Sequence, residues 1–224
     1  MSAPAIVFDL DGTLIDSAPD ICAIGNTVLE AEGARPMTLA EARGYVGSGA
    51  GEFVRRMMAA RGLPEADHPR LLERFVGLYE GAVELSAVYP GVVDALAVLA
   101  ARGHALGVCT NKPEAPARTV LAHFGLAPRF GAVIGGDSLR VRKPDPAPLF
   151  AAFEGMGAAP GLYVGDSEVD AQTAERAGLP FLLFTEGYRK TPAEALTHAA
   201  RFAHWDALPG LVADHLDRAA GKIA

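Results

Sequence analysis

Five short apolar runs recur along this 224-residue chain, and each has the length of a buried β-strand. Helical patterns separate several of them, as over Gly91–Gly103 and Ala115–Phe124. Alternating strands and helices favour a parallel sheet, whose strands are covered on both faces and are therefore apolar throughout. The sequence thus predicts an α/β fold with a doubly wound, mainly parallel sheet. The predicted strands are Ala5–Leu10, Ala105–Thr110, Ala132–Ile134, Gly161–Gly165 and Phe181–Thr185.

Helical periodicity alone fills the stretch from Asp16 to Glu84, after the first predicted strand. We expect a helical insert domain at 16–84, placed within a Rossmann-like core domain made of 1–15 and 85–224. The helices of the insert are predicted at Pro19–Glu32, Thr38–Tyr45, Gly51–Arg61 and His68–Leu85. Near the carboxyl end, helices predicted at Thr191–His198 and Ala207–Ala220 flank a short strand near Arg201–Trp205.

The composition restricts the compartment and the partners of the chain. A formal net charge of -7 argues against nucleic acid as the main partner, because binding to its phosphates needs a basic face. No apolar run reaches the roughly 18 residues of a membrane span, and residues 1–5 lack the basic start of a signal peptide. Cys22 and Cys109 lie in apolar contexts, so a disulfide framework is not expected. We expect a cytoplasmic protein, monomeric or homodimeric, that does not contact a membrane.

The ends of the predicted strands carry polar residues that are costly near an apolar core unless they have partners. The carboxyl ends of parallel strands share one edge of the sheet, where ligands bind, so we expect these residues to converge. Their carboxylates suit Mg²⁺ or Mn²⁺, and their amide, hydroxyl and ammonium groups suit a phosphoryl group. The residues are Asp9, Asp11, Thr110, Asn111, Lys143, Asp166 and Asp170.

Purely structural roles would also explain several of these residues. Asp11-Gly12 is a common turn, Thr110 could cap the following helix, and Asp170 suits the first turn of a helix because of the helix dipole. Lys143 would usually be a solvated surface residue, but the chain contains only four lysines. The strand ends taken together favour one site over several separate structural roles.

Four short motifs occur in order at these strand ends and resemble those of the haloacid dehalogenase-like hydrolase superfamily. The resemblance covers essentially the whole chain, with the helical stretch where the superfamily inserts its cap. Within the superfamily, the runs 16–20 and 89–92 are most similar to the bacterial phosphoglycolate phosphatase family. The motifs are Asp9-Leu10-Asp11-Gly12-Thr13, Thr110-Asn111-Lys112, Lys143-Pro144-Asp145-Pro146 and Gly165-Asp166-Ser167-x-x-Asp170.

The resemblance implies a Mg²⁺-dependent phosphomonoester hydrolase that acts on a small phosphorylated metabolite and works through an aspartyl-phosphate intermediate. Asp9 would be the nucleophile. Asp11 would protonate the leaving alkoxide and then deprotonate the attacking water. The other implied roles are metal binding by Asp9, Asp166 and the backbone carbonyl of Asp11, positioning of metal-bound waters by Asp170, and phosphate binding by Thr110, Asn111 and Lys143.

The residues at the strand ends indicate the reaction. The sequence of the predicted cap says less about the substrate. A flexible loop with Gly47, Ser48 and Gly49 precedes a predicted helix, where backbone amides would meet a small anion. A plain interhelical turn is the alternative. If the loop approaches the strand ends, the expected substrate is a short phosphoester that carries a carboxylate, such as 2-phosphoglycolate.

Other functions on this fold are open on the sequence alone. They are hydrolysis of a sugar phosphate or pyrophosphate, a sugar phosphomutase, and a non-catalytic binding protein. Dehalogenase chemistry is disfavoured by Asp11, because dehalogenases of the superfamily lack that second acidic residue. A phosphonatase is disfavoured because no lysine precedes Lys112 to form its Schiff base.

Overall fold

A six-stranded sheet lies at the centre of the computed structural model, which describes residues 3–79 and 81–220. Each neighbouring pair of strands is parallel, which confirms the predicted doubly wound, mainly parallel sheet. The chain builds outward from the central first strand on one side and then returns to its other side. In spatial order the strands are β5 (Ala132–Ile134), β4 (His104–Cys109), β1 (Ala3–Phe8), β6 (Pro160–Gly165), β7 (Phe181–Phe184) and β8 (Ala200–Phe202).

Helices cover both faces of this sheet. One face packs against α5 (Val92–Ala101), α6 (Glu114–His123) and α9 (Leu208–Ala220), and the other against α7 (Ala147–Met156) and α8 (Glu168–Ala177). Successive residues of a strand point to opposite faces, so Ile6 and Phe8 of β1 belong to the first apolar core while Ala5 and Val7 belong to the second. Because both faces are apolar, polar side chains gather where the strands end.

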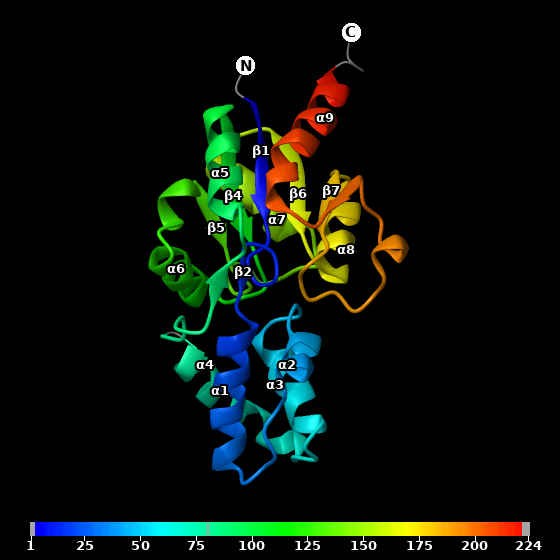
Figure 1. Ribbon diagram of the computed structural model, residues 1–224. Helices are drawn as coiled ribbons and strands as arrows, with labels where there is room; N and C mark the ends of the chain where they lie inside the picture. The colour runs from blue at the N-terminus through cyan, green and yellow to red at the C-terminus, as the bar shows by residue number, and fades with distance from the viewer. Residues whose placement is uncertain (1–2, 80, 221–224) are drawn as a thin grey trace.

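Four further helices form a separate layer beyond the carboxyl ends of the strands (Figure 1). They are α1 (Ala18–Ala31), α2 (Leu39–Tyr45), α3 (Ala50–Ala59) and α4 (His68–Tyr79). Their buried side chains, among them Leu29, Met57 and Phe75, form an apolar core of their own. The start of α2 follows a sequence rule for helix N-termini, because Thr38 and Glu41 form a capping box. The helical layer is therefore held together largely by its own contacts.

Two chain crossings join this helical layer to the sheet. They pair with each other as a short antiparallel ribbon of β2 (Ile15–Asp16) and β3 (Ala87–Val88). The sequence analysis did not predict this ribbon, because two-residue strands are too short to show a periodic pattern. The ribbon holds the outgoing and returning segments side by side, at the point where relative movement of the two layers would have to occur.

The return crossing begins earlier than the sequence predicted. The helix predicted at His68–Leu85 ends at Tyr79, and residue 80 lies outside the described chain. Beyond it, the Asp20 carboxylate accepts hydrogen bonds from the Leu85 backbone N–H (3.1 Å) and the Ser86 hydroxyl (2.5 Å). These bonds from α1 hold the segment in an extended path, which a continuing helix could not follow.

The prediction of a helix at Thr191–His198 is wrong. Only a 3₁₀ turn forms there, at Ala193–Ala195. The Lys190 backbone N–H donates to the Glu168 carboxylate (2.6 Å), so this part of the segment follows α8 rather than forming its own helix. The short strand expected after it is present as β8, but Trp205 lies beyond that strand and is buried in the core.

Several features bear on the expected compartment and domain bounds. Cys22 and Cys109 are both buried and free. No helix within the described ranges has both the length and the apolar character needed to cross a membrane. Residues 1–2 and 221–224, at the outer ends of the predicted core domain, lie outside the described chain.

Candidate active site

The loop after β1 places Asp9 and Asp11 at the edge of the sheet that faces the helical layer. The Asp9 backbone N–H donates to the Val164 carbonyl (2.8 Å), so β1 and β6 hold the start of the loop between them. Gly12 has a φ of +84°, and a Cβ atom at this position would lie 2.7 Å from Asp166 Oδ2. Glycine is therefore required both for the turn and for the approach of the loop to Asp166.

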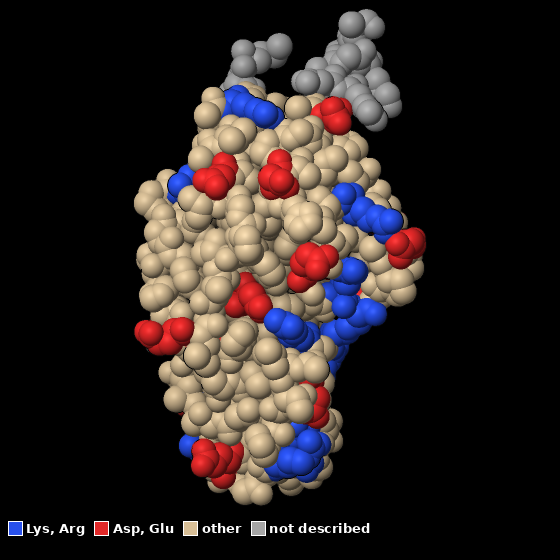
Figure 2. Space-filling view, viewed as in Figure 1, with Lys and Arg blue, Asp and Glu red and all other residues tan. Residues whose placement is uncertain are grey.

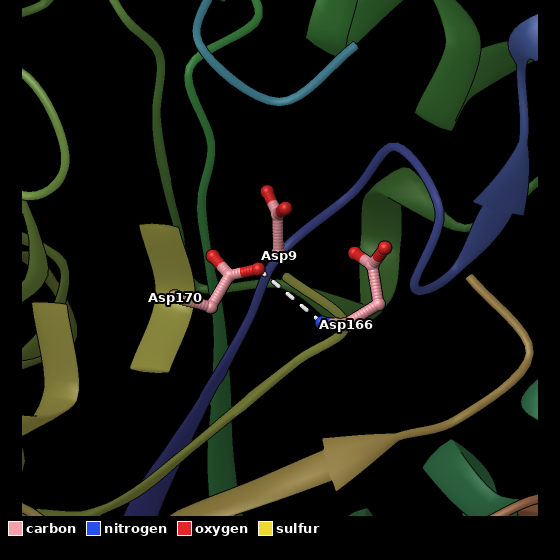
Figure 3. A group of neighbouring side chains, drawn as sticks. All are labelled: Asp9, Asp166 and Asp170. Atoms are coloured by element: carbon pink, nitrogen blue, oxygen red, sulfur yellow. Dashed lines mark hydrogen bonds between the residues drawn. The ribbon is translucent and has the colours of Figure 1, made fainter. Parts of the chain in front are cut away.

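Three carboxylates meet at this edge, and Figure 3 shows Asp9, Asp166 and Asp170 side by side. One oxygen from each lies within 4.8 Å of the others, and all three residues are buried. Burial, together with repulsion from Asp170, raises the pKa of Asp9 to about 7 despite the nearby ammonium of Lys143. The same two causes raise the pKa of Asp166 well above its usual range. A cluster of this kind needs cations to stay ionised.

Lys143 supplies one of these cations. Its Nζ lies 2.9 Å from Asp9 Oδ1 and 2.7 Å from Asp170 Oδ1, and it donates to the Tyr163 hydroxyl (2.8 Å). Burial alone would lower the Lys143 pKa, but the two carboxylates outweigh it and raise the pKa. The sequence predicted that Lys143 binds phosphate, and the structure places its ammonium directly beside the predicted nucleophile.

Asp170 is fully engaged by protein donors. Its Oδ2 accepts from the backbone N–H groups of Asp166 (3.2 Å, dashed in Figure 3) and Ser167 (3.1 Å) and from the Ser167 hydroxyl (2.6 Å). Its Oδ1 accepts from Lys143 and from the Tyr163 hydroxyl. Burial would raise the Asp170 pKa, but Lys143 and these hydrogen bonds lower it. Asp170 therefore positions Lys143 and the Asp166 loop, and the expected positioning of metal-bound waters by Asp170 stays a prediction.

The remaining carboxylate oxygens fit a divalent cation. Asp9 Oδ1 is buried and has no hydrogen-bond donor, since its contact with Lys143 is an ion pair without hydrogen-bond alignment. Asp166 accepts one hydrogen bond on each oxygen, from the Thr13 hydroxyl (2.9 Å) and the Tyr188 backbone N–H (2.6 Å), which leaves lone pairs on both. Oxygen ligands of this kind suit Mg²⁺. The donor set therefore fits such an ion.

Asp11 stands at the side of the site nearest the helical layer. Its Oδ1 accepts from the Ser17 hydroxyl (2.6 Å) and from Lys112 Nζ (3.2 Å). Lys112 Nζ also donates to the hydroxyl of Tyr79 in α4 (2.6 Å). The sequence analysis assigned no role to Lys112 or Tyr79: Lys112 was visible within its motif, whereas Tyr79 carried no local signal. With two buried lysines among four neighbouring aspartates, the site keeps an excess of negative charge that one divalent cation would balance.

Thr110 and Asn111, which directly follow β4, differ in the groups they leave free. The Thr110 hydroxyl oxygen accepts from the Lys112 backbone N–H (3.2 Å), and the hydroxyl hydrogen has no acceptor among the described residues. The Asn111 side-chain amide donates to the carbonyls of Gly47 (3.0 Å) and Lys143 (3.1 Å). Asn111 therefore links the helical layer to the site, and in this arrangement its amide has no free donor for the phosphate contact that the sequence predicted.

A cavity of about 30 Å³ separates the strand ends from the helical layer. A cavity needs roughly 10–15 Å³ to hold one water, so this space accepts a group of only a few atoms. Gly47 and Gly49, both expected near the substrate, line it, whereas Ser48 is not among the lining residues. The lining consists of Asp9, Asp11, Ile21, Val46, Gly47, Gly49, Ala50, Phe53, Phe75, Tyr79, Thr110, Asn111 and Lys112.

Magnesium is expected to stabilise the wild-type protein and not the Asp166→Asn variant. A ligand at 100 times its Kd adds about 2.7 kcal/mol, which for a chain of this size raises the unfolding temperature by about 5–10 °C. Asp166→Asn removes one charge from the buried cluster of Asp9, Asp166 and Asp170, so the shift should nearly vanish. Thermal unfolding with MgCl₂ or EDTA measures the shift, and Asp94→Asn, an exposed carboxylate on α5, should retain it. Equal shifts in wild type and Asp166→Asn would contradict this metal site.

The chain is similar to known proteins over most of its length. A family model described as haloacid dehalogenase-like hydrolase matches residues 6–184. A phosphoglycolate phosphatase of Cereibacter sphaeroides is 51% identical over 212 residues, covering 93% of this chain and 97% of its own. One of Rhodobacter capsulatus is 49% identical over 212 residues, with 94% and 97% covered. A predicted phosphoglycolate phosphatase from Haemophilus somnus has a crystal structure that superimposes with a TM-score of 0.86 at 29% identity, covering 94% of this chain and 98% of that one.

Proposed function

Because the chain belongs to the haloacid dehalogenase-like hydrolase family, we propose that it hydrolyses 2-phosphoglycolate to glycolate and phosphate through a phosphorylated Asp9. The observation that carries this proposal is the small cavity in which Asp9, Asp11 and Thr110 face the cap residues. Relatives named phosphoglycolate phosphatase, about half identical over nearly the whole chain, support the substrate.

The chemistry follows from two aspartates with different neighbours. A carboxylate oxygen of Asp9 attacks phosphorus, and the bond between phosphorus and the ester oxygen breaks. Asp11 donates a proton to the departing glycolate oxygen. Asp11 then takes a proton from a water, whose oxygen attacks phosphorus, and Asp9 leaves with the electrons of its bond to phosphorus. Asp11 Oδ2 has no hydrogen-bond partner among the described residues, so it is available for both transfers.

Charge on the phosphoryl group is balanced by groups placed around Asp9. The Lys143 ammonium, 2.9 Å from Asp9 Oδ1, would face a phosphoryl group attached to that residue. The Thr110 hydroxyl would donate its free hydrogen to a phosphate oxygen. We propose that Asp9, Asp166 and the Asp11 carbonyl hold Mg²⁺, although Mn²⁺ would suit the same oxygens. When bound, the ion supplies Lewis-acid stabilisation of the phosphoryl oxygens.

The size and polarity of the cavity favour a short anionic substrate. A space of about 30 Å³ has room for a unit of a few atoms, such as the two-carbon end of 2-phosphoglycolate, but none for a nucleoside. The first turn of α3 has no side-chain cap, and Gly49 and Ala50 at its start line the cavity. Unbonded backbone N–H groups at the positive end of a helix stabilise anions. This environment would suit the glycolate end of the substrate.

Basic residues at the surface would help an anionic substrate to approach a protein of net charge -7. Figure 2 shows Lys and Arg side chains gathered at the level where the two layers meet. A groove there is lined by Arg43 from α2 and by Arg189 and Lys190 from the loop after β7. The loop also reaches the metal site, because the backbone N–H of Tyr188 donates to Asp166.

We further propose that residues 16–84 act as a cap that closes over the site and excludes water from the first step. The Asn111 amide, bonded to the Gly47 carbonyl, would hold the cap in the closed position. The protein would act in the cytoplasm, as a monomer or homodimer, and the buried free thiols of Cys22 and Cys109 suit a reducing compartment.

A phosphate-release panel tests the proposed substrate. With Mg²⁺ present, kcat/KM for 2-phosphoglycolate is expected to exceed that for glucose 6-phosphate, AMP and pyrophosphate by on the order of 10²-fold or more, because the cavity rejects larger groups. A preference for another compound would remove 2-phosphoglycolate and leave phosphatase activity intact. Interconversion of two sugar phosphates without phosphate release would indicate a mutase instead.

A further inference from the structure

Lys112 and Tyr79 form a polar pair inside an otherwise largely apolar part of the cavity wall. Lys112 Nζ donates to the Tyr79 hydroxyl (2.6 Å) and lies 4.0 Å from the centre of the Tyr79 ring. Both residues are buried, at 7% and 6% exposure. Lys112 comes from the loop after β4 and Tyr79 from the last turn of α4. The pair therefore exists only while the helical layer sits against the sheet.

This pair retains donors that the protein does not use. A lysine ammonium carries three N–H bonds, and the structure gives Lys112 Nζ two acceptors, Asp11 Oδ1 and the Tyr79 hydroxyl. The Tyr79 hydroxyl accepts from Lys112, and its own hydrogen has no acceptor within 3–79 and 81–220. Unused donors in a buried site are costly, and both residues line the cavity. A ligand with two acceptor oxygens would satisfy both donors at once.

The charged side chains around the cavity indicate that this ligand is an anion. Lys112 is the only lysine or arginine among the residues that line the cavity. Lys143, the other buried ammonium, is already enclosed by Asp9, Asp170 and Tyr163. The other side chains on the cap side of the cavity are mainly apolar, among them Ile21, Phe53 and Phe75, so apart from Tyr79 this side offers an anion only backbone N–H groups at the start of α3. Lys112 is therefore the only cationic side chain of the lining that can pair with a second negative group on the substrate.

We infer that Lys112 and Tyr79 recognise the carboxylate of the substrate and thereby select short phosphoesters that carry one. This inference rests on the proposed function, since it assigns the specificity of the same site. One carboxylate oxygen would accept from Lys112 and the other from Tyr79, while the phosphoryl group meets Asp9 across the cavity. Because Tyr79 belongs to the cap and Lys112 to the core, the carboxylate would also favour the closed arrangement.

Two substrates that differ only in the carboxylate test the assignment. Ethyl phosphate replaces the carboxylate of 2-phosphoglycolate with a methyl group, so the ratio of their kcat/KM values measures carboxylate recognition. We expect Lys112→Met to lower this ratio on the order of 10²-fold, and Tyr79→Phe about 10-fold, from the strength of hydrogen bonds to charged groups. Any effect of Lys112 through Asp11 acts on both substrates and cancels in the ratio.

Control variants distinguish carboxylate recognition from a general loss of structure or activity. Tyr45→Phe removes a cap hydroxyl outside the cavity, and Arg74→Met removes an exposed charge of α4 outside both the cavity and the basic groove, so both should keep the wild-type ratio. Tyr79→Phe retains the buried ring, which keeps the test valid if Lys112→Met does not fold. In the double variant the losses should be less than additive, because both donors serve one carboxylate.

Two results would overturn the inference in distinguishable ways. If wild type prefers 2-phosphoglycolate but both variants keep the ratio within about threefold, below the effect of one lost hydrogen bond, the proposed function stands and carboxylate recognition lies elsewhere. If wild type itself shows no preference over ethyl phosphate, then the proposed substrate fails together with this assignment.

Discussion

Replacing Asp9 with asparagine is expected to lower phosphate release by on the order of 10⁴-fold or more, because a carboxamide is a very poor nucleophile toward phosphorus. The substitution keeps the shape of the side chain, so the cavity and its lining should persist. Removing the charge also relieves repulsion in a cluster whose burial raises the Asp9 pKa to about 7. We therefore expect the metal-free variant to unfold at a temperature no lower than that of the wild type at pH 8.

Single-turnover phosphate release and thermal unfolding in EDTA measure these two effects separately. Asp94→Asn makes the same chemical change at an exposed position and should alter neither. Loss of a nucleophile is expected to leave far less than a tenth of the wild-type activity. If Asp9→Asn kept more than about a tenth of that activity, Asp9 could not be the nucleophile.

Replacing Lys143 with methionine is expected to give the largest loss of stability, because Lys143 separates two buried carboxylates. Its ammonium lies 2.9 Å from Asp9 and 2.7 Å from Asp170, and the side chain is only 2% exposed. Removing one partner of a buried ion pair costs about 3–5 kcal/mol, since the other charge is left uncompensated. Activity should fall on the order of 10³-fold, as the charge facing the phosphoryl group is lost.

Urea unfolding in EDTA at pH 5 and pH 8 measures the stability loss. The loss should be smaller at pH 5, because protonation of the carboxylates then removes the uncompensated charge. Lys190→Met is the control, since its side chain is exposed. A change below about 1 kcal/mol at pH 8, as for an exposed pair, would mean that Lys143 does not hold the cluster together.

Much of the fold was predictable because buried parallel strands appear in the sequence as short, continuous apolar runs. The runs around Val7, Val108 and Val164 are apolar on both faces, and each was placed correctly. The prediction for residues 191–198 failed because helical composition there is outweighed by a tertiary contact, the bond from Lys190 to Glu168. Local patterns indicate a strand or helix well only where no distant partner takes the backbone groups.

The same difference applies to the site residues: those marked by the neighbouring sequence could be predicted, and those placed by packing between distant elements could not. Asp9 and Asp166 could be found because each directly follows a strand, and strand ends converge by topology. Tyr79 could not be found, since its place in the cavity depends on how α4 packs against the sheet. The amide of Asn111 was assigned to phosphate from its motif, and only the packed structure shows it bound to the Gly47 and Lys143 carbonyls.

The covalent intermediate on Asp9 is the central claim, and chemical trapping tests it most directly. Wild-type protein would be mixed with Mg²⁺ and ³²P-labelled 2-phosphoglycolate, quenched in acid during turnover, and treated with borohydride, which reduces an aspartyl phosphate to homoserine. The expected result is protein-bound label before reduction and homoserine at position 9 by peptide mass spectrometry, with neither in Asp9→Asn. Rapid turnover without bound label, or label and homoserine at another aspartate, would contradict the account.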